Sequence, residues 1–108
     1  MIRRGDVWWV TFPHGTGEEI RKTRPAIVVS NNAFNRRLNR LQVVPLTSET
    51  TNIYPGQVLL AVGSRKSKAM ADQIQTASRQ RLISRIGRVG RRDLANLDRA
   101  LKLQLGLR

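Results

Sequence analysis

Residues 25–30 read Pro-Ala-Ile-Val-Val-Ser, and this stretch decides how the chain folds. It is a continuous apolar run of strand length, and residues 41–46, Leu-Gln-Val-Val-Pro-Leu, form a second such run. Apolar runs of this length, without regular polar alternation, are typical of strands buried on both faces of a sheet. We therefore expect these two strands at the centre of the fold.

Other segments supply further strands around this centre. Residues 6–12, Asp-Val-Trp-Trp-Val-Thr-Phe, are rich in aromatic and β-branched side chains, and Pro13-His14-Gly15 ends the run. Residues 31–40 place Asn and Arg around Phe34 and Leu38, a spacing that suits one short helix packed by a single face. Shorter strand candidates are residues 57–60, 69–76 and 86–89.

The C-terminal segment is expected to form the one long helix. Its leucines recur at helical spacing, Asp93 lies in the first turn, and Gly106 supplies a stop; these leucines are Leu94, Leu97, Leu101 and Leu105. Antiparallel strands followed by such a helix predict a mainly β (α+β) fold, an SH3-like β-barrel with a C-terminal α-helix. With 108 residues the chain has room for one domain, which we expect to span residues 1–108.

The charge of the chain points to a polyanionic partner. Twenty Lys and Arg against seven Asp and Glu give a net charge of +13, whereas residues 41–64 carry no Lys or Arg and are expected to contribute to the core. Binding of basic side chains to phosphates is favoured because it releases counterions, so nucleic acid is the leading candidate for the partner. A ribosomal or merely soluble basic protein would have a similar charge, and charge alone does not separate these readings.

The composition also excludes several kinds of chemistry. Without cysteine there is no disulfide framework, thiolate metal site or cysteine nucleophile, which fits a reducing cytoplasm. The N-terminus lacks the long apolar stretch of a signal peptide or membrane helix, so we expect a cytoplasmic protein with no membrane partner. The chain has one His and no carboxylate cluster, so we expect no catalytic metal and no other cofactor. A single His also excludes a His pair that acts as acid and base.

Any catalysis must therefore use Arg, Glu, Thr, Ser or Asp, and two places bring such groups to the ends of apolar strands. Glu18, Glu19 and Arg24 precede the first run, and Thr47 and Ser48 follow the second. A guanidinium fork together with a directed hydroxyl would form a phosphate clamp. The plainer reading is that Arg24 is a solvated loop charge and Thr47 a turn residue, and spacing alone favours that reading.

The order of motifs along the chain resembles that of the MazF/PemK toxins. Gly-Asp-Val-Trp-Trp-Val at residues 5–10 is followed by Arg-Pro-Ala-Ile-Val-Val-Ser-Asn at residues 24–31 and by Val-Pro-Leu-Thr-Ser at residues 44–48. Further similar segments continue to the end of the chain and cover nearly all of it. They are Tyr54-Pro55 before residues 58–60, then residues 71–74, 86–89 and 97–101.

The resemblance implies an SH3-like barrel that dimerises and cleaves single-stranded mRNA without a metal. It makes Arg24 and Thr47 the active pair, and the RNA's own 2′-hydroxyl the nucleophile. The family loop before the arginine often reads Gly-Ser-Glu, whereas residues 15–19 here read Gly-Thr-Gly-Glu-Glu. Because this loop has two glutamates, either could correspond to the single glutamate of the family loop. We assign Glu19 rather than Glu18 as the third catalytic residue.

Partners and RNA contacts follow from the same resemblance. It implies an acidic MazE-like antitoxin that binds the basic surface and covers Arg24. We expect further RNA contacts from residues near the two strand ends and in the later motifs: Ser48, Arg21, Lys22, Asn31, Gln73 and Thr76.

Two other functions use the same fold. A non-catalytic toxin of the CcdB type would bind a protein target such as DNA gyrase, although the Arg24 and Thr47 motifs argue against it. A plain RNA-binding module would explain the charge equally well. An RNA cleavage assay separates the three.

Overall fold

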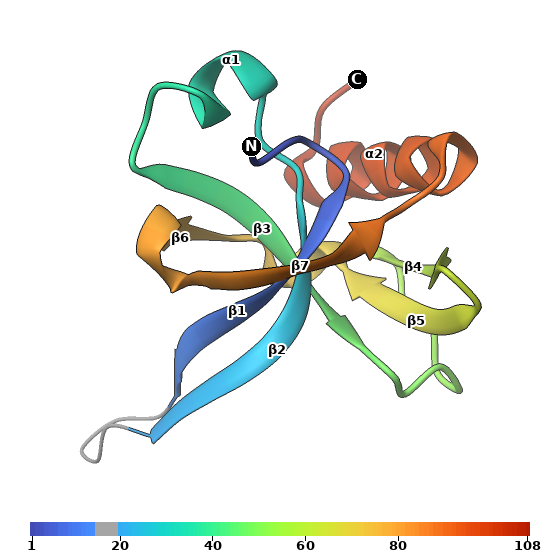
Figure 1. The fold of residues 1–108 in the computed structure, drawn as a ribbon. Coiled ribbons are helices and arrows are strands. Elements are labelled where there is room, and N and C mark those ends of the chain that lie inside the picture. The colour runs from blue at the N-terminus through green and yellow to red at the C-terminus, as the bar shows by residue number, and fades with distance from the viewer. Residues whose placement is uncertain (15–19) are drawn as a thin grey trace.

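The computed structural model describes residues 1–14 and 20–108, and Figure 1 shows their arrangement. Within these residues, seven strands belong to one antiparallel sheet and the longer helix follows the last strand. In chain order the elements are β1 (Asp6–His14), β2 (Ile20–Val28), α1 (Asn32–Asn35), β3 (Arg40–Thr47), β4 (Gln57–Val62), β5 (Arg65–Met70), β6 (Gln75–Ser78), β7 (Leu82–Arg88) and α2 (Arg91–Leu105). Two 3₁₀ turns, η1 (Ala71–Gln73) and η2 (Arg79–Arg81), flank β6.

The strands are ordered β4-β5-β3-β2-β1-β7 across the sheet, and β6 pairs with the first half of β3. The predicted mainly β fold with a C-terminal helix is confirmed. No ladder joins the end strands β4 and β7 in the part of the chain that the structure describes, so hydrogen bonds do not close the barrel there.

The central strands are apolar because β2 lies between two core clusters. Ile27 faces the first core cluster, whereas Ala26 and Val28 face the second. The first cluster includes Val7, Val44, Leu46, Leu60, Leu97 and Leu101, and the second includes Ile2, Val10, Phe12, Leu41, Val43 and Leu82. Since successive side chains of a strand point to opposite faces, a strand with a core on each side has no polar alternation.

Helix α2 covers the first core cluster through part of its leucine stripe. Leu97 and Leu101 are buried and Leu94 packs against them, whereas Leu105 is 53% exposed. Asp93, in the first turn, accepts a hydrogen bond from the Ala61 backbone N–H at 2.9 Å and ties the helix to β4. The helix ends at Gly106, whose φ of 69° is a left-handed conformation that glycine adopts without a Cβ clash.

Several strands differ from their predicted bounds because pairing partners far along the chain set them. β7 begins at Leu82 rather than at residue 86, since it pairs with β1 from Val10 onward. β2 begins at Ile20 rather than Pro25, since the hairpin with β1 pairs polar residues such as Thr23 with Thr11. The single strand predicted over residues 69–76 is wrong: β5 ends at Met70, η1 intervenes and β6 begins at Gln75. β5 pairs with the last residues of β3. The turn η1 then redirects the chain, so that β6 pairs with the first residues of β3.

Candidate active site

Arg24 lies in the middle of β2, opposite Val10 of β1, with its side chain partly exposed. It lines a cavity of about 270 Å³ where the β1–β2 hairpin meets the end of β3 and the η1–β6 segment. We call this space the Arg24 cavity; its lining consists of Phe12, Pro13, Lys22, Arg24, Pro45, Gln73 and Gln75. The sequence placed Arg24 just before an apolar strand, whereas the structure places it inside β2, which begins at Ile20, and adds the cavity beside it.

The lining of the Arg24 cavity suits a phosphate group. Arg24 and Lys22 supply two cations, and Gln73 and Gln75 supply amide groups. None of the described residues that line this cavity is acidic. Guanidinium and ammonium groups donate charge-assisted hydrogen bonds to phosphate oxygens, and no carboxylate in the lining competes for them.

Thr47, the last residue of β3, shares a sheet face with Arg24 but does not line its cavity. The β2–β3 ladder ends at the directly opposed pair Ala26–Pro45. Arg24 and Thr47 each lie two residues from this pair along their strands, so side-chain alternation puts both on the face of that pair. Directly opposed residues of antiparallel strands project from the same face. The Thr47 hydroxyl Oγ1 accepts a hydrogen bond from the Glu49 backbone N–H at 3.2 Å, which holds it at the start of the following turn.

The turn after Thr47 is organised by Glu49 and by Lys68. The Glu49 carboxylate accepts hydrogen bonds from the Thr51 backbone N–H at 2.6 Å and from its hydroxyl at 2.9 Å. These bonds lower the pKa of Glu49 below its usual value. Lys68, which pairs with Thr47 across the β3–β5 ladder, is buried and donates from Nζ to the Asn52 carbonyl oxygen at 2.8 Å.

Lys68 therefore anchors the segment that carries Thr47, and replacing it should loosen that segment. Lys68→Met keeps most of the apolar stem but leaves the Asn52 carbonyl without its donor, so we expect a loss of about 1–3 kcal/mol in the free energy of unfolding. Urea denaturation followed by circular dichroism measures this loss. Lys66→Met, at an exposed position of the same strand, is the control. Equal midpoints for the two variants would contradict the anchoring role.

The other predicted site residues fall into three groups. Lys22 and Gln73 line the Arg24 cavity. Ser48 is exposed after β3, Thr76 accepts a hydrogen bond from Gln42 Nε2 at 3.0 Å, and Asn31 caps α1 by accepting from the Ala33 N–H at 2.8 Å. Glu18 and Glu19 lie outside the described residues, as does the side chain of Arg21.

Sequence reasoning missed Gln75 and Lys68. Gln75 reaches the Arg24 cavity because β6 pairs it with Val43 of β3, a contact between segments that no local pattern announces. Lys68 lies in a six-residue strand whose sequence, Arg-Lys-Ser-Lys-Ala-Met, reads as solvated, although the second lysine is buried. Neither residue carried a signal in the sequence that would have marked it.

Two features are absent from the described ranges, 1–14 and 20–108. Within them, no three His, Asp or Glu side chains gather in a group that could hold a metal ion. Neither of the helices found there is long and apolar enough to cross a lipid bilayer.

Comparison with known proteins identifies the relatives of the chain. Residues 3–105 match the family model described as PemK-like, MazF-like toxin of type II toxin-antitoxin system. The chain is 43% identical to Endoribonuclease MazF9 of Mycobacterium tuberculosis, covering 99% of this chain and 98% of that protein. It is 31% identical to the Endoribonuclease toxin MazF of Escherichia coli, covering 94% and 92%.

Solved structures agree with this result. An endoribonuclease in complex with its cognate antitoxin from a Mycobacterial species superposes with a TM-score of 0.80 at 29% identity, covering 97% of this chain and 95% of that one. The MazE–MazF structure (form II) from Deinococcus radiodurans gives a TM-score of 0.81 at 28% identity, covering 97% and 96%.

Proposed function

Because the chain belongs to the PemK-like, MazF-like family of toxins of type II toxin-antitoxin systems, we propose that it is an endoribonuclease that cuts single-stranded RNA at the Arg24 cavity. The observation that carries this proposal is the cavity itself. Its described lining presents Arg24, Lys22 and two glutamines without an acid, in a chain whose curated relatives are named endoribonucleases. A negatively charged strand is the ligand that such a lining favours.

The proposed reaction uses the substrate's own nucleophile. The 2′-oxygen attacks the adjacent phosphorus and loses its proton, the bond from phosphorus to the 5′-oxygen breaks, and that oxygen gains a proton. The products are a 2′,3′-cyclic phosphate and a 5′-hydroxyl. No step requires a metal or a bound cofactor, which accords with a chain that has one His and no Cys.

We assign to Arg24 the role of stabilising the negative charge of the transition state. Negative charge grows on the phosphoryl oxygens during attack, and one preorganised donor directed at such charge contributes about 3 kcal/mol. Thr47, on the same sheet face, would hold the phosphate in line through its hydroxyl. A guanidinium is a poor base near neutral pH, so Glu19 is the proposed acceptor of the 2′-hydroxyl proton.

The same family membership supports the proposed partners. We propose that an acidic antitoxin related to MazE covers the Arg24 cavity, since a net charge of +13 attracts an acidic chain and two of the structural relatives are described as complexes with an antitoxin or with MazE. We also propose that the toxin acts as a homodimer on mRNA in the cytoplasm, where mRNA is translated. Exposed apolar side chains such as Trp9, Ile86 and Leu59 are compatible with a dimer contact.

The test of the function is cleavage of a long single-stranded RNA by the purified protein in the presence of EDTA. We expect discrete fragments, at a rate that the chelator leaves unchanged because no metal takes part. Binding without cleavage would favour the plain RNA-binding module. Absence of both binding and cleavage would favour a CcdB-like toxin with a protein target. Cleavage that stops on chelation would contradict the metal-independent mechanism.

A further inference from the structure

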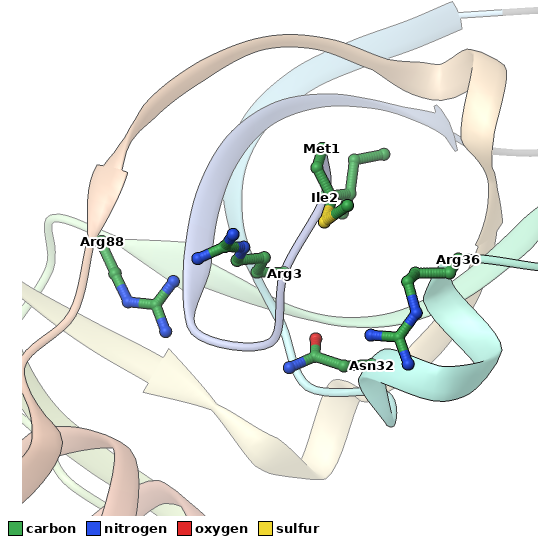
Figure 2. Close-up of a pocket in the computed structure, with 6 residues that line it drawn as sticks. All are labelled: Met1, Ile2, Arg3, Asn32, Arg36 and Arg88. Atoms are coloured by element: carbon green, nitrogen blue, oxygen red, sulfur yellow. The ribbon is translucent and has the colours of Figure 1, made fainter.

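A second basic cavity lies near the N-terminus, away from Arg24. It has a volume of about 390 Å³ and is lined by Met1, Ile2, Arg3, Asn32, Arg36 and Arg88. Figure 2 shows the three arginines and the Asn32 amide arranged around a common space. We call it the N-terminal arginine cavity. Its residues come from the segment before β1, from the α1 region and from the end of β7, so the fold alone brings them together.

Hydrogen bonds of the backbone and of the Asn32 side chain hold these segments in place. The Gly5 N–H donates to the Val28 carbonyl at 2.8 Å, and the Arg4 N–H donates to Asn32 Oδ1 at 2.7 Å. Asn32 Oδ1 also accepts from Asn35 Nδ2 at 3.3 Å. With its oxygen so engaged, the Asn32 amide has its NH₂ group left to donate to a ligand.

The charge of this cavity is not balanced locally. Arg88 Nη1 lies 3.2 Å from Oδ1 of the buried Asp6, which also receives Arg85 at 3.5 Å, so one carboxylate serves two guanidinium groups. For Arg3 and Arg36, no carboxylate of residues 1–14 or 20–108 lies within ion-pair distance. Both side chains are exposed, and their guanidinium groups are therefore open to a ligand that supplies negative charge.

The two basic cavities flank the second core cluster. Ile2 of that cluster lines the N-terminal arginine cavity, and Phe12 lines the Arg24 cavity. In Figure 1 the N-terminus lies near the start of β1, and the end of β1 lies far from it. Along β2, Arg24 and Val28 are separated by roughly 13 Å at the usual rise of a strand. Because the Gly5 N–H bonds to the Val28 carbonyl, the segment that carries Arg3 reaches the Val28 end of β2, a few nucleotide lengths from Arg24.

We propose that the N-terminal arginine cavity is a second phosphate subsite, which binds the RNA backbone a few nucleotides from the bond cut at Arg24. This inference rests on the proposed function. Guanidinium forks match the oxygens of a phosphodiester, and a space of about 390 Å³ accommodates a phosphate with its ribose, whereas a carboxylate side chain would leave most of it empty. The subsite would raise affinity and fix the strand's position without taking part in the chemistry.

The test compares two double variants that lose the same charge. Arg3→Gln with Arg36→Gln alters the cavity, and Arg99→Gln with Lys102→Gln alters two exposed positions on α2. The probe is a fluorescent single-stranded 2′-O-methyl RNA, which blocks attack by the 2′-oxygen, followed by anisotropy at several salt concentrations. For the cavity variant we expect a Kd for RNA raised about tenfold. The slope of log K against log salt concentration should be smaller in magnitude by about 1.4, the value for two lost phosphate contacts on a single strand. The α2 variant should stay near wild type.

Two outcomes would overturn the proposal. Equal losses in the two double variants would show only a general charge effect and overturn the subsite. A cavity variant that no longer binds a glutamate-rich peptide, but binds RNA as tightly as the α2 variant does, would overturn the RNA subsite in favour of an acidic protein ligand. Arg36→Gln alone should give about half the change in slope, which keeps the test open if the double variant folds poorly. If wild type binds RNA but cuts none, the proposed function fails while this comparison still decides the subsite.

Discussion

Arg24→Ala is expected to slow RNA cleavage by about 10²–10³-fold, the usual cost of removing one preorganised donor from a developing oxyanion. The side chain is partly exposed at the rim of its cavity, outside both core clusters, so the variant should keep its fold. The measurement is the single-turnover rate on a labelled single-stranded RNA, with circular dichroism to check folding. Arg24→Lys keeps the charge but loses the planar fork, and it should remain badly impaired.

The matched control for this prediction is Arg99→Ala, which removes one positive charge from the exposed surface of α2. Its rate should stay close to that of wild type, since general attraction between protein and RNA changes equally in both variants. An Arg24→Ala protein that is folded and cuts RNA as fast as Arg99→Ala would remove Arg24 from the mechanism.

Replacing the 2′-hydroxyl by hydrogen at the cleaved nucleotide should have an even larger effect, because it deletes the nucleophile. We expect cleavage at that bond to fall below detection, while the substituted strand binds with nearly unchanged affinity through its phosphates and bases. Competition binding against the all-RNA strand measures the affinity, and gel analysis measures the cut. Continued cleavage at the substituted nucleotide would mean that water or a protein group is the nucleophile.

The sequence predicts the central part of the fold well, for a physical reason. Residues 25–28 and 41–46 lie in strands with a core on each side, and a strand is apolar where cores cover both of its faces. The early start of β2 at Ile20 escaped prediction because its polar first half is held by pairing with β1 rather than by burial. The turn η1 was not predicted because its position depends on two ladders, in which β5 and β6 pair with different parts of β3.

The sequence pointed to three residues of the Arg24 cavity, two of them on β2 and one on η1. Arg24, Lys22 and Gln73 come together as a set of cavity residues, and the motif next to an apolar strand pointed to Arg24. The N-terminal arginine cavity could not be predicted, because Arg3, Arg36 and Arg88 come from three segments that are distant in the sequence. Each of these arginines looks like an ordinary surface charge until the fold places them around one space.

The central claim is that the chain cleaves RNA at Arg24 by means of the RNA's own 2′-hydroxyl. Mass spectrometry of the cut ends tests it most directly, with wild type and Arg24→Ala purified side by side and both assayed in EDTA. Attack by the 2′-hydroxyl leaves 2′,3′-cyclic phosphate and 5′-hydroxyl ends, which we expect from wild type, with hardly any cut ends from Arg24→Ala. Fragments with 5′-phosphate ends, or the same fragments in equal amount from Arg24→Ala, would contradict it.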